Sequence, residues 1–73
     1  MAEKSSELTK LVTIATDLQF TANLRTKAIE QIGSLGTHEA LLALLDLVAN
    51  TGLVRAEREL ALKHAREIVK SSD

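Results

Sequence analysis

The stretch that decides the fold covers residues 36–50 and reads Gly-Thr-His-Glu-Ala-Leu-Leu-Ala-Leu-Leu-Asp-Leu-Val-Ala-Asn. On a helix with about 100° per residue, this stretch is apolar almost all round. Its apolar face consists of Leu41, Leu44, Leu45 and Val48, and the two flanks of that face are Leu42 and Leu47. Only Glu39, Ala43 and Asp46 form a narrow polar strip. Because such a helix is normally buried on several sides, we expect it to be the central helix.

The composition predicts an all-α chain. The 73 residues include no Pro, Tyr or Trp and a single aromatic residue, Phe20. Leu, Ala, Glu, Lys and Arg dominate, and these residues favour helices. The alternation typical of strands is absent. We therefore expect one helical domain, residues 1–73, and the internal repeat described below pairs its four helices into two antiparallel helical hairpins.

Charge and cysteine content narrow the classes of function. The net charge is −1 and the pI is about 6.1, so neither a basic surface for nucleic acid nor a polybasic membrane patch is expected. Without Cys there is no disulfide and no thiolate nucleophile. The N-terminus carries no apolar leader, and the run Ala40 to Leu45 is too short to span a bilayer. These features predict a cytoplasmic protein.

Four helices are expected, at about residues 6–19, 23–35, 38–49 and 53–70. Their predicted caps are Ser5 or Ser6, then Thr21 or Asn23, then Thr37 at the N-termini, with Gly36 as a left-handed C-terminal cap. We expect the third helix to stop at residues 50–52, where Asn and Gly suit left-handed conformations. Gly33 lies inside a helix, and we expect it to allow close approach of a neighbouring backbone.

The apolar spacing predicts the buried side of the other three helices. The expected inner residues of the first helix are Leu8, Leu11, Val12, Ala15 and Leu18. Those of the second are Leu24, Ala28, Ile29, Ile32 and Leu35, and those of the fourth are Val54, Ala61, Ala65 and Ile68.

Two leucines of the fourth helix do not fit its inner stripe. Leu53 and Leu60 lie together on one flank, near His64. Leu53 either packs under the preceding turn, with Leu60 a lone exposed leucine, or the two form a second apolar contact surface. The residues that we predict as candidates for contact with another protein, or with a second copy, are Leu53, Leu60, His64, Leu42 and Leu47.

An imperfect internal repeat relates the second helix to the fourth. A shift of about 33 residues places Arg25 on Arg58 and Ala28 on Ala61, whereas a shift of about 30 places Arg25 on Arg55. Periods of this length with two helices per unit are typical of helical repeat arrays.

Three motifs resemble the HEAT-repeat family. They are Leu24-Arg25-x-x-Ala28-Ile29-x-x-Ile32-Gly33, then residues 36–45, then Leu53-Val54-Arg55. The family's usual Pro and turn Asp are missing. The resemblance implies a non-catalytic scaffold or adaptor that binds another protein through its helical surface. Two repeats are fewer than the three usually needed for a continuous core, which implies self-association or a closed four-helix bundle.

The sequence does not predict an enzyme, and we expect neither a cofactor nor a metal. His64 and Glu67 are one turn apart but lack the further ligands of a metal site. His38 and Glu39 have no partnered nucleophile. No phosphate-binding glycine loop or serine elbow is present.

Binding of nucleic acid is the alternative function. The fourth helix carries Arg55, Arg58, Lys63, Arg66 and Lys70, but glutamates lie between these basic residues. The leucines of the third helix do not read bases. We therefore expect another protein, or a second copy of this chain, as the partner, and neither nucleic acid nor a membrane.

Overall fold

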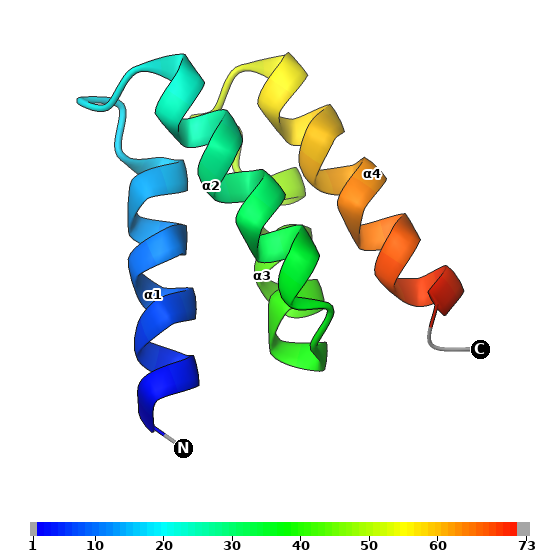
Figure 1. Ribbon diagram of the computed structural model, residues 1–73. Coiled ribbons are helices and arrows are strands. Elements are labelled where there is room, and N and C mark those ends of the chain that lie inside the picture. The colour runs from blue at the N-terminus through cyan, green and yellow to red at the C-terminus, as the bar shows by residue number, and fades with distance from the viewer. Residues whose placement is uncertain (1, 72–73) are drawn as a thin grey trace.

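The computed structural model describes the backbone of residues 2–71 and the side chains of residues 7–71, and this part of the chain is all-α (Figure 1). Its helices are α1 (Ala2–Thr16), α2 (Ala22–Leu35), α3 (His38–Ala49) and α4 (Arg55–Ser71). Helices α1 and α2 form one antiparallel hairpin and α3 and α4 form a second. No strand occurs among residues 2–71, so the predicted fold class is confirmed.

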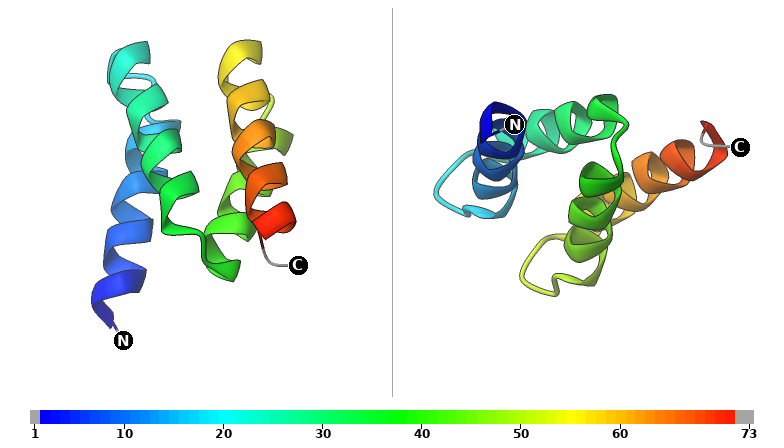
Figure 2. Two further views of the ribbon diagram at one scale, coloured as in Figure 1. Left: turned by 45° about the vertical axis from the view of Figure 1, so that its right-hand side comes forward. Right: turned by 90° about the horizontal axis from the view of Figure 1, so that it is seen from below.

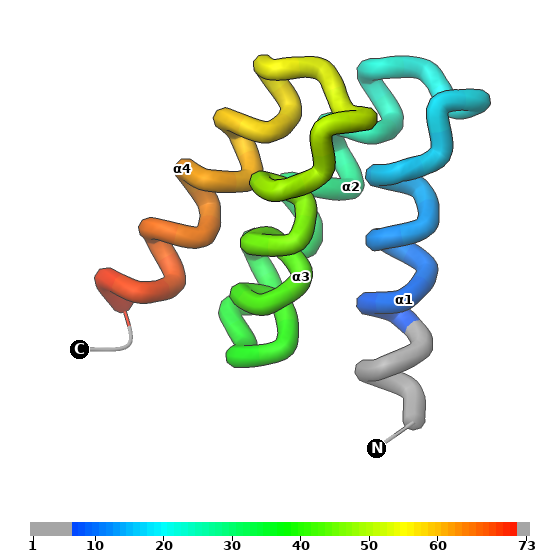
Figure 3. The backbone as a smooth tube through the Cα atoms, turned by 180° about the vertical axis from the view of Figure 1, so that it is seen from behind, coloured from blue at the N-terminus to red at the C-terminus, as the bar shows by residue number. Residues whose placement is uncertain are grey.

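The hairpins stack mainly through α2 and α4, which run in the same direction (Figure 1). Helix α2 lies between α1 and α4, and α3 lies behind it, as the views in Figures 2 and 3 show. Within the described part of the chain, helix α3 touches α1 only marginally and α1 makes no contact with α4. The expectation that the leucine-rich helix is central is therefore wrong, because α2 holds that place.

The buried core is made of small and branched aliphatic side chains. It consists of Ala15, Ala28, Ile29, Ile32, Ala40, Leu44, Leu47, Leu53, Ala61, Ala65 and Ile68. On α3 the buried face is thus centred on Leu44 and Leu47, while Leu42 and Leu45 are 50% and 44% exposed. A sequence with leucine on every side does not determine which side faces the core, and the predicted face that contained Leu45 is rotated from the real one.

The predicted inner stripes are correct in the middle of the helices and wrong at their ends. Leu18, Leu24 and Val54 are 61%, 46% and 52% exposed, although the spacing placed them inside. They lie in or beside the connectors that precede α2 and α4, past the region that the neighbouring helices cover. In contrast, Leu53 is 4% exposed and belongs to the core, as the first of the two interpretations predicted. The same interpretation made Leu60 a lone exposed leucine, which is wrong, because Leu60 is partly buried against the core.

The caps that join the helices are largely those that the sequence predicts. The Thr21 hydroxyl accepts a hydrogen bond from the Leu24 N–H, and the Thr37 hydroxyl accepts one from the Ala40 N–H at 3.0 Å. Gly36 has φ 65°, the left-handed conformation that glycine adopts without strain. Asn50, however, is extended, and its side chain accepts from the Gly52 N–H instead, so the left-handed stop predicted there is wrong.

Helix α1 differs most from its predicted range. It begins at Ala2, so neither Ser5 nor Ser6 is its cap, and the side chains of those serines lie outside the described residues. It ends at Thr16 rather than Gln19, because the Asp17 carboxylate accepts a hydrogen bond from the Gln19 N–H and closes a turn.

Candidate protein-binding surface and the α2–α4 interface

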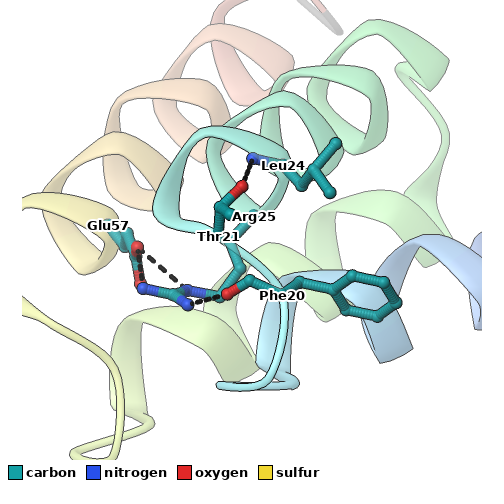
Figure 4. Close-up of polar contacts among 5 residues, drawn as sticks. All are labelled: Phe20, Thr21, Leu24, Arg25 and Glu57. Carbon is teal, nitrogen blue, oxygen red and sulfur yellow. Dashed lines mark hydrogen bonds and ion pairs between the residues drawn. The ribbon is translucent and has the colours of Figure 1, made fainter.

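A buried ion pair links the two hairpins. Arg25 of α2 and Glu57 of α4 have side chains that are only 9% and 4% exposed (Figure 4). Glu57 Oε2 accepts a hydrogen bond from Arg25 Nε at 3.0 Å and lies 2.9 Å from Arg25 Nη2. The third nitrogen of the guanidinium, Nη1, donates to the Phe20 carbonyl oxygen at 2.6 Å. The pair therefore ties the first connector, α2 and α4 together.

The Arg25–Glu57 pair is a buried contact between the two hairpins. Removing one partner of a buried pair leaves an uncompensated charge, which is strongly destabilising. Both contacts of Arg25 with Glu57 converge on Oε2, and the buried Oε1 has no hydrogen-bond partner within the described chain. In the sequence, Glu57 is one of the glutamates that lie between the basic residues of the fourth helix, and its pairing with Arg25 was not predicted.

A second close contact between α2 and α4 involves Gly33 and His64. A Cβ atom on Gly33 would lie only 2.6 Å from Nδ1 and 2.9 Å from Cβ of His64. The glycine thus allows close approach, as predicted, but to a side chain rather than to a backbone. The His64 side chain is 19% exposed, and its Nδ1 lies 3.4 Å from a carboxylate oxygen of Glu67.

The five predicted contact residues are not equally accessible. Leu47 and Leu53 are 1% and 4% exposed, so they reach a partner only if the chain opens. Leu60 packs partly against the core, and His64 is held against Gly33. Leu42 is the one of the five with a largely exposed apolar side chain.

Leu42 is part of an exposed apolar strip that the sequence analysis did not recognise as a unit. Leu45 is 44% exposed, and Ala49 is also exposed. Residues three or four apart lie on the same side of a helix, so Leu42, Leu45 and Ala49 form one outward row, which we call the α3 patch. The signal was the excess of leucine on α3, which we interpreted as burial on several sides rather than as an apolar outer face.

No group of three His, Cys, Asp or Glu residues able to hold a metal ion occurs in the described part of the chain. Among the described helices, none combines the length and the apolar character needed to cross a membrane.

Comparisons of the sequence and structure with family models, curated proteins and solved structures gave no match.

Proposed function

We propose that this chain is a non-catalytic module that binds another protein in the cytoplasm through the outer face of α3. Two helical pairs stacked through equivalent helices are the arrangement expected of a HEAT-like scaffold. The starts of α2 and α4, Ala22 and Arg55, are 33 positions apart, as one of the two repeat registers requires. The observation that carries the proposal is the α3 patch.

The α3 patch suits contact with a protein because its leucines are exposed on a helix that is anchored from its other side. Leu44 and Leu47 on the buried side of α3 are fully enclosed, so the helix is held while Leu42 and Leu45 face outward. Exposed apolar side chains gathered on one face are typical of protein contact surfaces. A second copy of the chain is one partner that this surface could take.

The proposal is tested by cross-linking the tagged chain in an extract of its native source and identifying the captured proteins. We expect Leu42→Lys with Leu45→Lys to lose a specific captured partner while keeping the wild-type free energy of unfolding. The matched control is Leu18→Lys with Val69→Lys, which also adds two charges at side chains that are 61% and 54% exposed. Retention of the same partners by the α3 variant would reject the α3 patch as the contact surface.

A further inference from the structure

A surface pocket of about 220 Å³ lies between α3 and α4. Val48 of α3 and Leu62 of α4 give it aliphatic walls, and Arg55, Arg58 and Glu59 of α4 give it charge. The volume is below the 300–1,000 Å³ that is typical of small-molecule sites, so it suits one or two side chains of a larger partner. None of the five predicted contact residues lines this pocket.

The charges in the pocket are not balanced. Arg55 Nε lies 3.2 Å from Glu59 Oε2, and both side chains are mostly exposed, so these two residues largely neutralise each other. Arg58 has no such partner among residues 7–71. Its Nε is buried and makes no hydrogen bond within the described chain, and the adjacent Glu57 carboxylate is engaged by Arg25.

The Arg58 guanidinium forms no ion pair within the described residues, so a carboxylate that approaches it from the pocket would gain a charge-assisted interaction. A guanidinium presents its N–H groups in a planar fork that matches a carboxylate. The aliphatic walls formed by Val48 and Leu62 favour apolar groups beside that carboxylate. Nucleic acid fits less well, because its binding depends on several uncompensated basic groups and this pocket has one.

We propose that the Arg58 pocket, lined by Val48, Arg55, Arg58, Glu59 and Leu62, binds an Asp or Glu side chain flanked by an aliphatic residue on a partner protein. This inference rests on the proposed function, since it names the chemistry of the partner. The pocket opens beside α4, whereas the α3 patch uses a different set of residues. The two sites share no residue, so each can be substituted separately.

The experiment is a titration of the isotope-labelled full chain followed by NMR. The probes are the peptide acetyl-Ser-Leu-Glu-Leu-Ser-amide, its counterpart with Gln in place of Glu, and a short DNA duplex. We expect the Glu peptide to shift the Arg58 Nε–H signal and the backbone amides of Val48 and Leu62. The Gln peptide should bind about tenfold more weakly, because a charge-assisted hydrogen bond is lost.

Single substitutions of Arg58 and Arg66 test whether the Glu peptide binds at Arg58. Arg58→Gln should weaken binding of the Glu peptide by about tenfold, and Arg58→Lys, which keeps the charge but loses the fork, by less. Arg66→Gln is the matched control, because Arg66 is an exposed arginine on the same helix and outside the pocket. It should bind the Glu peptide as the wild type does.

Three outcomes overturn the pocket: equal binding of the Glu and Gln peptides, equal losses in Arg58→Gln and Arg66→Gln, or tighter binding of the DNA duplex at the same signals. None of these affects capture of a partner through the α3 patch. Conversely, if the peptide binds the pocket but Leu42→Lys with Leu45→Lys changes no captured protein, the α3 surface fails and the pocket stands.

Discussion

Replacing Gly33 by alanine tests how closely α2 and α4 fit. In an unobstructed helix this change stabilises by about 1 kcal/mol, because alanine has the higher helix propensity. Here the new Cβ would lie 2.6, 2.7 and 2.9 Å from Nδ1, Cγ and Cβ of His64. Rotating the imidazole does not relieve the contact with the His64 Cβ, which is fixed to the α4 backbone. Helix α4 must therefore move away from α2.

Overpacking of this kind costs about 1–3 kcal/mol, which exceeds the gain in helix propensity. We expect Gly33→Ala to lower the free energy of unfolding by about 1 kcal/mol. His64→Gly removes all three obstructing atoms. In that background Gly33→Ala should instead raise the free energy of unfolding by about 0.5–1 kcal/mol, because only the propensity effect remains.

The assay is urea unfolding followed by far-ultraviolet circular dichroism for the wild type, both single variants and the double variant. An unchanged dependence on urea concentration would show that the change is in stability alone. Ser34→Ala, an exposed substitution next to Gly33, is the control and should stay within about 0.5 kcal/mol of the wild type. If Gly33→Ala raises the free energy of unfolding of the otherwise unchanged chain by about 1 kcal/mol, the full gain in helix propensity, then His64 does not contact Gly33 closely. The close packing of α2 against α4 at this point would then be incorrect.

Three further predictions concern single side chains, each measured as the free energy of unfolding in urea. Leu44→Ala should destabilise by about 2–5 kcal/mol, because Leu44 is 0% exposed and leaves a cavity, and a change under about 1 kcal/mol would contradict that burial. Thr37→Ala should cost about 1 kcal/mol through loss of the cap on the Ala40 N–H, whereas Thr37→Ser should not. Arg55→Ala should cost less than about 1 kcal/mol and become neutral in high salt, because its pair with Glu59 is exposed; a loss that persists in salt would indicate a buried role.

The features that could be predicted from sequence are those set by a few neighbouring residues. The Thr21 and Thr37 caps and the left-handed Gly36 each depend on one side chain and the backbone beside it. The helical class follows from composition and spacing in the same way. Such local preferences survive folding because nothing in the tertiary structure opposes them.

What the sequence did not reveal depends on contacts between distant segments. Arg25 and Glu57 are 32 residues apart, and each looks like a surface charge until α2 and α4 are placed side by side. On α3, leucines on every side made the hydrophobic period uninformative, so Leu45 was assigned to the core and Leu47 to a flank. Leu24 has the right spacing for burial, yet it lies in the first turn of α2, beyond the cover of its neighbours.

The sequence predicted that contact residues would be mainly apolar side chains on the helices, but it did not predict which residues form the α3 patch or the Arg58 pocket. Leu42 was one of the five predicted contact residues and is 50% exposed, but recognising the α3 patch it shares with Leu45 required the orientation of α3. The Arg58 pocket depends on the approach of Val48 to α4, which no spacing within one helix encodes. Its basic residues had been noted only as part of the alternative, nucleic-acid interpretation.

The fold depends on the stacking of the two hairpins through α2 and α4, and a double-mutant cycle on Arg25 and Glu57 tests that stacking most directly. The variants are Arg25→Met, Glu57→Leu and the two combined, with trimethylamine N-oxide added where a single variant is largely unfolded. Each single change should lower the free energy of unfolding by about 3–5 kcal/mol, because it leaves a buried charge without its partner. The double variant should lose less than either single variant. A double variant whose loss equals the sum of the two single losses would show that these side chains do not meet, and would contradict the stacking of α2 on α4.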